Sequence, residues 1–504
     1  MTKGGGVRHH EGMDTERMRA RVLDASEHGP EAVVALVATL LSEVAGQVAT
    51  LSARVTALES ENAGLRARLE TTSHNSGKPP SSDGPGVKPH PTSQRGRSGR
   101  PSGGQVGHTG HTRGLVDEAD EVQTHAPSCC VGCGQSLAFI PALRRERRQV
   151  VDIPPIKARV IEHQAQTVCC PQCGTETSGA FPPEVAAPVQ YGPGVVTLAV
   201  YLTQEQLLPL ARTRAVLAEV FGCPVAEGTI ERAVATCHER LASVEAAIKQ
   251  GVLSAPVAHF DETGVHIRDT LAWLHVASTP RLTFYAVHPK RGRVAMDALN
   301  VLPQFRGRAV HDGLTSYGQY DQCAHALCNA HHLRELTFVE EQLGQGWAAI
   351  LKGVLGEGKQ AVDAACARGE AGVSEEVRQE LTRRYDAALE EGARANPPAP
   401  PTGTRGRPTR GKAGNLVDRL RTHKEATLAF LSDTTIPFDN NQAERDIRMT
   451  KVREKISGCF RTPTGGARFC RIRGYISTLR KQGQPIFAAL SQALSGNPLL
   501  PLTC

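Results

Sequence analysis

The stretch Pro256-Val-Ala-His-Phe-Asp-Glu-Thr-Gly264 is the part of the chain on which the fold prediction depends. Residues 256–260 have the apolar and aromatic character of a buried strand, and this strand pattern ends at Asp261. Outward from it, the next fifty residues contain two more strand patterns, one helical pattern and a fourth strand pattern that runs into Asp312. These four patterns occupy residues 272–277, 282–287, 293–302 and 307–311.

The order of these patterns predicts an α/β domain. Three strands in succession, then a helix, then a fourth strand is the chain order of a ribonuclease H-like fold, in which the first and fourth strands are neighbours. Asp261 and Asp312 end those two strands, so we expect their side chains to converge although 50 residues lie between them. The sequence therefore predicts a ribonuclease H-like catalytic domain over residues 250–481, followed by a C-terminal tail, 482–504.

Converging carboxylates suit chemistry on a phosphodiester backbone. Two Mg²⁺ (or Mn²⁺) ions about 4 Å apart stabilise charge on the entering and leaving oxygens, and such hard cations prefer carboxylate ligands. A third carboxylate usually completes the site. Glu444 is the best candidate, because Asp439 or Asn440 can cap a helix that begins just before it. We predict that Asp261, Asp312 and Glu444 are catalytic and bind both metal ions.

Other acids remain alternatives, because an isolated acid at the end of a strand is usually a turn residue or a cap. The acids that compete with the two aspartates are Asp297, Asp321, Glu262 and Glu335, and those that compete with Glu444 are Asp433, Asp439 and Asp446.

A strongly basic segment follows Glu444 and continues to residue 481 with few acids. A metal-binding acid beside a basic surface is what an enzyme that acts on a polyanion requires. The cations expected to contact DNA in this segment are Arg445, Arg448, Lys451, Arg453 and Arg461.

A seven-residue apolar repeat runs through residues 31–72, after a polar segment, 1–30, that is expected to be disordered. Valine at the first core position and leucine at the second favour a parallel two-stranded coiled coil, and one Asn in the core fixes its register. The predicted partner is therefore a second copy of the chain. The alternative is an amphipathic helix that packs on the rest of the protein. The repeat places Val34, Leu41, Val48, Val55, Asn62 and Leu69 at one core position and Val37, Val44, Leu51, Leu58 and Leu65 at the other.

Residues 73–120 are rich in Gly, Pro, Ser and cations. This composition cannot bury enough apolar surface to fold alone, so it predicts a flexible basic linker. We expect Arg95, Arg97 and Arg100 in this linker to lie along DNA phosphates.

Two cysteine knuckles, Cys130-Val-Gly-Cys133-Gly and Cys170-Pro-Gln-Cys173-Gly, predict a small zinc module over residues 121–182. Paired thiolates at this spacing suit tetrahedral Zn²⁺, and four thiolates leave no open position, so one structural zinc ion is expected. Cys129 and Cys169 lie next to the knuckles and leave the choice of ligands open. The chain contains fourteen cysteines and disulfides are not expected in it, so metal binding is the leading explanation for its cysteine content.

Residues 183–249 have a helical pattern. One apolar helix ends at Gly222 and a second begins near Thr229, as in a helix-turn-helix, whose second helix enters the major groove of DNA. We expect Thr229 and Arg232 to contact DNA, although an ordinary helical hairpin would give the same pattern.

The 131 residues between Asp312 and Glu444 exceed what the fold requires, so the segment 337–434 predicts a helical insertion. Just before it, Cys328 and His331 form a Cys-x-x-His pair after an expected fifth strand. Two ligands without partners favour a structural contact between strand and helix over a zinc site.

The bulk properties set the broad class. A chain of 504 residues with a net charge of +7 predicts a multidomain protein whose charge is modest overall. The opening residues contain no apolar run, and no charge-free apolar stretch reaches the ~18 residues that span a bilayer. We therefore expect a cytoplasmic, nucleoid-associated protein with no membrane partner.

Several long and unusual strings resemble the transposases of the insertion sequence 66 family of bacterial mobile elements. The most specific are His325-Ala-Leu-Cys-Asn-Ala-His-His-Leu-Arg-Glu335 and Asp439-Asn-Asn-Gln-Ala-Glu-Arg-Asp-Ile-Arg448, continued by Ser457-Gly-Cys-Phe-Arg461. Both knuckles and the Tyr191-Gly-Pro string belong to the same resemblance, which has small departures at Gly77 and Ser102.

The resemblance implies a transposase that binds the terminal inverted repeats of a mobile element in double-stranded DNA. It implies cleavage to a 3′-hydroxyl and joining to target DNA by two-metal transesterification, with an Asp-Asp-Glu triad at Asp261, Asp312 and Glu444. A coiled coil, a zinc module and a helix-turn-helix are implied as well. Accessory proteins of the element are implied as further partners.

Overall fold

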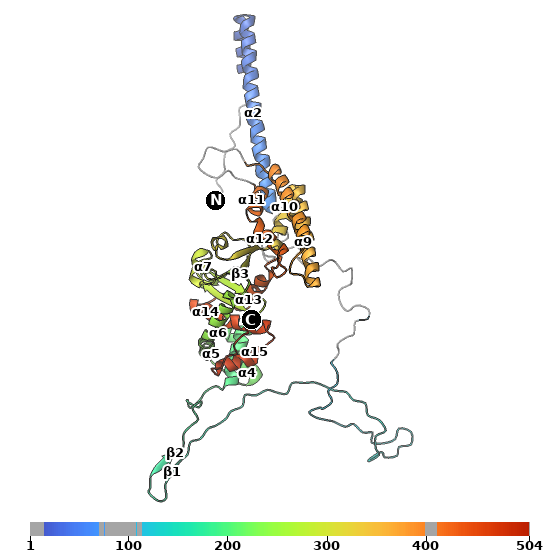
Figure 1. The fold of residues 1–504 in the computed structure, drawn as a ribbon, viewed down its shortest axis with the longest axis vertical. Coiled ribbons are helices and arrows are strands. Elements are labelled where there is room, and N and C mark those ends of the chain that lie inside the picture. The colour runs from blue at the N-terminus through green and yellow to red at the C-terminus, as the bar shows by residue number, and fades with distance from the viewer. Residues whose placement is uncertain (1–14, 70–74, 76–106, 108–112, 399–410, 503–504) are drawn as a thin grey trace.

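The structure is a computed structural model that describes residues 15–69, 75, 107, 113–398 and 411–502. Arg95, Arg97 and Arg100, with most of the predicted basic linker, lie outside these residues. The described chain contains a long N-terminal helix, an irregular segment with two cysteine knuckles, a helical region, a five-stranded sheet and a helical insertion. The insertion and helices α4 to α6 lie at opposite ends of the sheet domain (Figure 1).

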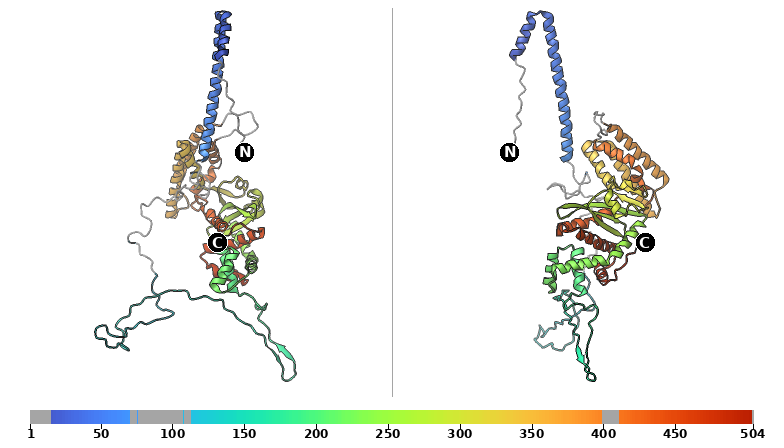
Figure 2. Two further views of the ribbon diagram at one scale, coloured as in Figure 1. Left: turned by 180° about the vertical axis from the view of Figure 1, so that it is seen from behind. Right: turned by 90° about the vertical axis from the view of Figure 1, so that its left-hand side faces the viewer.

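The N-terminus forms a helical hairpin. Helix α1, Thr15–Glu27, folds back against the start of helix α2, Pro30–Leu69 (Figure 2). Gly29, with a φ of 96°, makes the tight turn, and Pro30 occupies the first position of α2, where a missing N–H is tolerated. The predicted disorder of residues 1–30 therefore does not hold for α1, because the sequence Thr15–Glu27 is built from good helix formers and buries Ala25.

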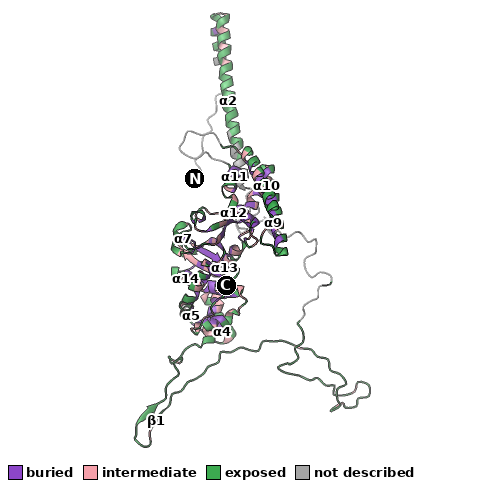
Figure 3. Ribbon diagram, viewed as in Figure 1, coloured by how far each residue is buried: buried purple, intermediate pink, exposed green. Residues whose placement is uncertain are grey.

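Beyond its contact with α1, helix α2 extends away from the sheet domain, and most of its side chains that the structure describes are exposed (Figures 1 and 3). Val34 and Leu41, at the predicted core positions, are 69% and 66% exposed, so the helix does not pack on its own chain there. By length and composition, Pro30–Thr56 also meets the criteria for a membrane-crossing helix, with a mean hydropathy of 1.8. That span contains Glu31, Glu43 and Arg54.

Four helices and a π-helix follow the irregular segment: α3, Pro193–Val200; η2, Tyr201–Glu205; α4, Leu210–Phe221; α5, Glu227–Arg240; and α6, Ala242–Leu253. Helix α4 ends at Gly222, which takes the left-handed conformation with a φ of 61°. Helix α5 begins two residues before Thr229, and α4 packs against it. The expected pair of helices joined by a short turn is therefore present in the fold.

The sheet has the order β5-β4-β3-β6-β7, with strands β3, Val257–Ile267; β4, Thr270–Ser278; β5, Thr283–His288; β6, Arg308–His311; and β7, Ala324–Leu327. Strands β3, β4 and β5 are antiparallel, whereas β6 and β7 run parallel to β3. Helix α7, Arg293–Leu299, connects β5 with β6. The first and fourth strands are thus neighbours, as the chain order predicted.

Strand β3 differs from the prediction in its length. It continues past Asp261 to Ile267, because β4 extends alongside it and pairs as far as Thr270. The parallel partner β6 pairs with β3 only as far as His259. Asp261 therefore lies inside its strand, at the point where the parallel half of the pairing has ended.

Two helices cover the sheet: α13, Asn441–Ser457, contacts β3 and β4, and α14, Pro463–Lys481, contacts β5. The predicted C-terminal tail contains a further helix, α15, Ile486–Leu494, which packs on α3 and α5. Its apolar residues recur at helical spacing, and Leu490 and Ala493 are fully buried. This segment is therefore part of the core, which corrects the prediction of a tail.

Ion pairs hold the helical region against helix α14 of the sheet domain. Glu205 of η2 accepts a hydrogen bond of 2.7 Å from Arg473 of α14 and also contacts Arg480. The side chains of Glu205 and Arg473 are 5% and 3% exposed, so neither charge can be left alone without a large loss of stability.

The insertion is a helical layer whose core is built around Trp347, Leu351, Tyr385 and Leu420 and extends to Val310 and Ala326 of the sheet. Its helices are α8, Asn329–Leu343; α9, Gly346–Arg368; α10, Glu375–Ala395; α11, Lys412–Thr422; and α12, Lys424–Leu428. The helical insertion expected at 337–434 is therefore present, and its first helix starts earlier, directly after β7.

Gly307 provides a test of the packing at the start of β6. A Cβ atom there would lie 2.5 Å from Ala255 O and 2.6 Å from Pro256 O, which are backbone atoms that cannot move aside cheaply. We expect Gly307→Ala to lower the free energy of unfolding by about 1–3 kcal/mol. Thermal unfolding followed by circular dichroism measures this. Gly318→Ala is the control, because a Cβ at that exposed glycine meets nothing within 4 Å; equal midpoints for the two variants would contradict the packing argument.

Candidate active site

Asp261 lies in β3 and Asp312 directly follows the neighbouring parallel strand β6, and each carboxylate is oriented by a backbone hydrogen bond. Asp261 Oδ1 accepts the N–H of Glu262 at 2.8 Å, and Asp312 Oδ1 accepts the N–H of Leu314 at 2.9 Å. Gly313, with a φ of 90°, makes the turn that follows Asp312. Each bond engages only one of the two carboxylate oxygens, so the second oxygen of each aspartate can bind a ligand.

The three predicted carboxylates act on one another electrostatically. Burial raises the pKa of Asp261 well above its usual value, and the charges of Glu262, Asp312 and Glu444 raise it further. A carboxylate in this position repels its neighbours unless a cation or a proton is present. The site therefore has the charge and the oxygen-only chemistry that fit hard divalent cations.

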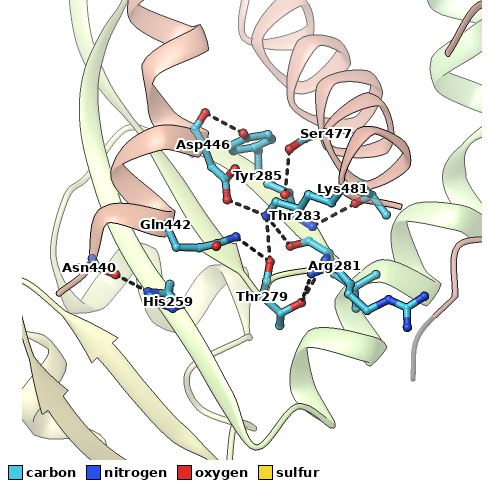
Figure 4. Close-up of polar contacts among 12 residues, drawn as sticks. His259, Thr279, Arg281, Thr283, Tyr285, Asn440, Gln442, Asp446, Ser477 and Lys481 are labelled. Carbon is cyan, nitrogen blue, oxygen red and sulfur yellow. Dashed lines mark hydrogen bonds and ion pairs between the residues drawn. The ribbon is translucent and has the colours of Figure 1, made fainter. Parts of the chain in front are cut away.

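Glu444 lies in the first turn of α13, near enough for its charge to raise the pKa of Asp261, although among the described residues the three carboxylates do not form one close group of potential metal ligands. Asn440 occupies the N-cap position, but its side chain bonds to β3 rather than to its own helix. Its Oδ1 accepts from His259 Nδ1 at 2.9 Å (Figure 4). Its Nδ2 donates to Phe260 O at 2.9 Å. Local capping falls instead to Asp439, whose Oδ1 accepts the N–H of Asn441. Asn440 is 1% exposed and ties the helix that carries Glu444 to the strand that carries Asp261.

Most competing acids are engaged in other contacts. Asp446 pairs with Lys481 at 2.8 Å (Figure 4). Asp433 and Asp439 accept local backbone bonds, and Asp321 is exposed. Asp297 accepts from the Tyr320 hydroxyl, and Glu335 pairs with Arg419 of the insertion. The hydrogen bonds and ion pairs of the paired acids explain their positions without a role in metal binding.

Glu262 is the nearest competitor, but its carboxylate belongs to a buried network. Its side chain is fully buried, accepts from Arg291 Nε at 2.8 Å and accepts from the Tyr317 hydroxyl at 2.6 Å. The Arg291 guanidinium also lies 4.8 Å from the centre of the Trp273 ring. Glu262 therefore positions Arg291 rather than offering a free ligand.

Arg291 is a site residue that sequence reasoning did not single out. Its side chain is 42% exposed, and the charge of Asp312 contributes to raising its pKa, so the guanidinium lies at the edge of the carboxylate cluster. The signal in the sequence was the basic string Lys290-Arg-Gly-Arg293 directly after β5. That string alone does not distinguish an active-site arginine from a solvated turn.

A relay of histidines supports the loop that carries Asp312. His311 Nδ1 accepts the N–H of Gly313 at 3.0 Å, so its proton is on Nε2, which donates to His325 Nδ1 at 3.0 Å. The His311 ring stacks on Tyr317 at a centroid distance of 4.5 Å. Burial lowers the pKa of His311 to about 3, so the ring stays neutral and keeps this arrangement at ordinary pH.

Cys328 and His331 lie beside Glu444. Cys328 is the N-cap residue of α8, and its Sγ accepts the N–H of Asn440 at 3.1 Å. The expected structural contact therefore joins the ends of two helices, α8 and α13. The thiol, one ring nitrogen of His331 and one carboxylate oxygen of Glu444 all lie within 4.8 Å of one another.

The basic residues after Glu444 divide into two groups. Arg445, Arg448 and Arg461 are exposed. Lys451 is exposed and contacts Gly264 O and Glu454. Arg453 instead folds inward, because its guanidinium lies 3.7 Å from the centre of the Phe460 ring and donates to Gly458 O at 3.0 Å. Burial lowers the pKa of Arg453 to about 10, and its contacts are those of a structural residue.

The helix-turn-helix candidates differ in accessibility. Arg232 on α5 is exposed, and Thr229 is half-buried. Glu231, between them in the sequence, pairs with Arg468 of α14, so one edge of α5 faces the sheet domain. Arg232 is the more accessible of the two predicted contact residues.

Each cysteine knuckle forms a separate tight turn. Cys130 N–H donates to Gln135 O at 2.8 Å and Gly134 N–H donates to Cys130 O at 2.9 Å; Cys170 and Gly174 repeat this geometry, flanked by strands β1, Thr167–Cys169, and β2, Glu176–Ser178. Bonds from the backbone of Gly132 and from Cys133 lower the pKa of Cys130, and bonds from Thr175 and Cys170 lower that of Cys173. The two thiols of each knuckle are thus already adjacent, although the four do not form one cluster in the described chain.

Replacement of Asp261 tests the electrostatic strain of the site. Because the pKa of Asp261 is raised in the folded state, its carboxyl group stabilises the fold below about pH 3.8 and loses that contribution as the pH rises through the raised pKa. We expect metal-free Asp261→Asn to be more stable than the wild type at neutral pH by on the order of 1 kcal/mol, and equal to it in acid. Thermal unfolding between acid and neutral pH measures the difference. If Asp261→Asn were less stable than the wild type at neutral pH, the prediction would be wrong. Asp269→Asn, in an exposed turn, is the control.

Comparison with known families agrees with this architecture. Residues 188–468, which are 281 of the 504, match the Transposase IS66 family. Residues 127–174 match the zinc-finger binding domain of transposase IS66, and residues 25–114 match a family of unknown function (DUF6444). The curated proteins contain no match to the chain. Since the first match covers more than half of the chain and includes the whole of the sheet, this protein belongs to the IS66 family of transposases and carries that family's zinc-finger domain.

Proposed function

We propose that the chain is an Asp-Asp-Glu transposase, which cleaves the ends of a mobile element to a 3′-hydroxyl and joins them to target DNA. The observation that carries the proposal is that Asp261 in β3 and Asp312 after the neighbouring strand β6 lie close enough to Glu444 of α13 for the charges of Asp312 and Glu444 to raise the pKa of Asp261. The sheet order and its strand directions support a ribonuclease H-like catalytic domain. Membership in a transposase family supports DNA as the substrate.

The carboxylate cluster fits two hard divalent cations. Bound by Asp261, Asp312 and Glu444, two Mg²⁺ or Mn²⁺ ions would stabilise charge on the entering and leaving oxygens of the phosphodiester. Arg291, held by Glu262 and Trp273 beside Asp312, is suited to bind the scissile phosphate.

The two reactions share one site. In cleavage, water attacks the phosphorus at the end of the element, and the bond from phosphorus to the 3′-oxygen breaks to leave a 3′-hydroxyl. In joining, that 3′-oxygen attacks a phosphodiester of the target and the target's own 3′-oxygen leaves with a proton. One P–O bond forms and one breaks in each step, so no covalent intermediate with the protein is needed.

The exposed face of α13 is the proposed DNA path into the site. Arg445, Arg448, Lys451 and Lys455 are exposed and recur at three- and four-residue spacing, so they follow one stripe along the helix. The stripe begins next to Glu444. Such a row neutralises successive phosphates and brings the backbone to the carboxylates.

The N-terminal parts are proposed to bind and pair the element ends. The apolar stripe of α2, with Val34, Leu41 and Val48 exposed, supports a parallel homodimer through a coiled coil. Helices α4 and α5 are proposed to act as a helix-turn-helix on the terminal inverted repeats, with Arg232 toward DNA. Accessory proteins of the element are proposed partners. A nucleoid substrate implies a cytoplasmic protein without a membrane partner.

The zinc-finger domain is proposed to bind one structural zinc ion through Cys130, Cys133, Cys170 and Cys173. The preformed thiol pairs and the pKa values that their hydrogen bonds lower support these ligands, because the thiolate is the form that binds zinc. Cys129 and Cys169 are exposed alternatives next to each pair.

Two charge-removing variants test the catalytic triad. We expect Asp261→Asn and Glu444→Gln to lower Mg²⁺-dependent nicking and joining of labelled element ends by at least about 100-fold, because each removes a metal-binding oxygen charge. Binding of the same ends, measured by gel shift, stays close to that of the wild type. Asp269→Asn should retain full activity. Wild-type-like joining by Asp261→Asn would refute the triad, and specific binding without cleavage by the wild type would indicate a chain that only binds DNA or needs an accessory protein.

The two groups of cations on α13 make a second test. We expect Arg448→Ala to weaken DNA binding and to reduce the slope of log affinity against log salt by about 1, without loss of stability. Arg453→Ala is matched in chemistry but should lower the thermal midpoint and leave the salt slope unchanged, because its guanidinium packs on Phe460. If Arg453→Ala instead reduced the slope of log affinity against log salt and left the stability unchanged, Arg453 would be a DNA contact and its structural role would be refuted.

A further inference from the structure

Cys328, His331 and Glu444 form a group of three potential metal ligands next to the proposed catalytic site. One donor atom from each, a thiol sulfur, an imidazole nitrogen and a carboxylate oxygen, lies within 4.8 Å of the other two. Around a single tetrahedral zinc ion such donors are about 3.3–3.7 Å apart, as follows from bond lengths near 2.0–2.3 Å. Small side-chain movements would therefore bring all three to one ion.

The scaffold holds these donors in place through the meeting of two helix starts. Cys328 caps α8 and His331 lies three residues later, so both face the same side of the first turn. Glu444 lies in the first turn of α13. The two starts are joined by the bond from Asn329 N–H to Phe438 O at 3.1 Å and by the bond from Asn440 N–H to Cys328 Sγ. Hydrogen bonds of this kind to a ligating atom orient it toward a metal.

A buried atom without a partner points to a missing ligand. His331 Nδ1 is buried and makes no hydrogen bond within the described part of the chain. Leaving a buried polar atom unpaired destabilises a fold by about 1–3 kcal/mol, and a bound ion removes that penalty. The orphan nitrogen belongs to the same residue that completes the three-donor group.

The donor set selects the kind of metal. Sulfur and imidazole nitrogen are poor ligands for Mg²⁺ and good ligands for zinc-like cations. Three protein ligands leave a fourth position open, unlike the four thiolates of the knuckles. Burial raises the pKa of the Cys328 thiol to about 12 in the metal-free protein, so a bound cation must displace the thiol proton.

We propose that Cys328, His331 and Glu444 bind a zinc-class divalent cation at a site that is separate from the zinc finger and that shares only Glu444 with the proposed hard-cation positions. Binding follows from the donor geometry alone. Its effect on catalysis rests on the proposed function: because Glu444 is shared, zinc at this site withdraws a carboxylate oxygen from Mg²⁺ and inhibits DNA cleavage.

Zinc stoichiometry of the full-length protein tests the binding. After chelation and equilibrium dialysis against Zn²⁺, we expect the wild type to bind two ions per chain. His331→Ala and Cys328→Ser should each bind one fewer, whereas the matched control Cys130→Ser/Cys133→Ser should lose the other ion. His331→Ala removes an unpaired ring nitrogen rather than a bonded one, so it is expected to fold even where Cys328→Ser does not. Wild-type stoichiometry in a folded His331→Ala would overturn the proposal.

Cobalt gives an independent readout. In the Cys130→Ser/Cys133→Ser background, Co²⁺ should produce a thiolate-to-cobalt charge-transfer band that disappears with Cys328→Ser. A band that survives this change would assign the metal to other cysteines and refute the site.

A nicking assay in Mg²⁺ with added Zn²⁺ then separates the two proposals. Zinc inhibition that His331→Ala relieves supports both. If the wild type nicks DNA normally in Mg²⁺ but His331→Ala binds as many zinc ions as the wild type, the zinc site is refuted and the transposase assignment is unaffected. The expected stoichiometry without any nicking by the wild type leaves the zinc site intact and counts against the proposed function.

Discussion

Asn440 connects three segments that are far apart in the sequence, and the geometry of the carboxylate cluster depends on it. Its amide group bonds to His259 and to the backbone of Phe260 on β3, while its backbone N–H bonds to Cys328 at the start of α8. Because the residue is buried, water cannot replace these bonds. The position of Glu444 relative to Asp261 is thus set by hydrogen bonds made one turn before Glu444 itself.

The acidic residues of the molecule fall into two classes, those left without an internal counter-charge and those paired with an arginine or a lysine. The three carboxylates must remain close enough to share cations, which raises the pKa of Asp261 and weakens the metal-free fold. Neighbouring pairs are instead neutralised internally: Glu262 by Arg291, Asp446 by Lys481, and Glu205 by Arg473. The molecule therefore concentrates uncompensated negative charge where an external cation can bind it.

The sequence predicted the parts of this architecture that follow from local pattern. Strand order, the adjacency of β3 and β6, the helix that carries Glu444 and the two knuckle turns could all be inferred from periodicity and spacing. Which basic residues are exposed and which are packed inward could not be inferred, because Arg448 and Arg453 have similar sequence surroundings. Only tertiary packing places the Phe460 ring against the Arg453 guanidinium. In the same way, Arg468, Arg471 and Arg473 resemble a DNA-binding surface in the sequence but pair with glutamates of the helical region. Helix α15 was missed because its apolar faces are short and its partners, α3 and α5, lie about 250 residues earlier.

The closure of the helical insertion has a consequence for how such a protein can change over time. Its two ends meet where Asn329 N–H bonds to Phe438 O, and its helices pack in a core that also includes Val310 of β6 and Ala326 of β7. Residues gained or lost in the parts of the insertion remote from the sheet therefore leave the stem closed, whereas changes next to Val310 and Ala326 would reach the strands. The remote part of the insertion can therefore diverge in sequence and length while the strands and α13 keep their positions.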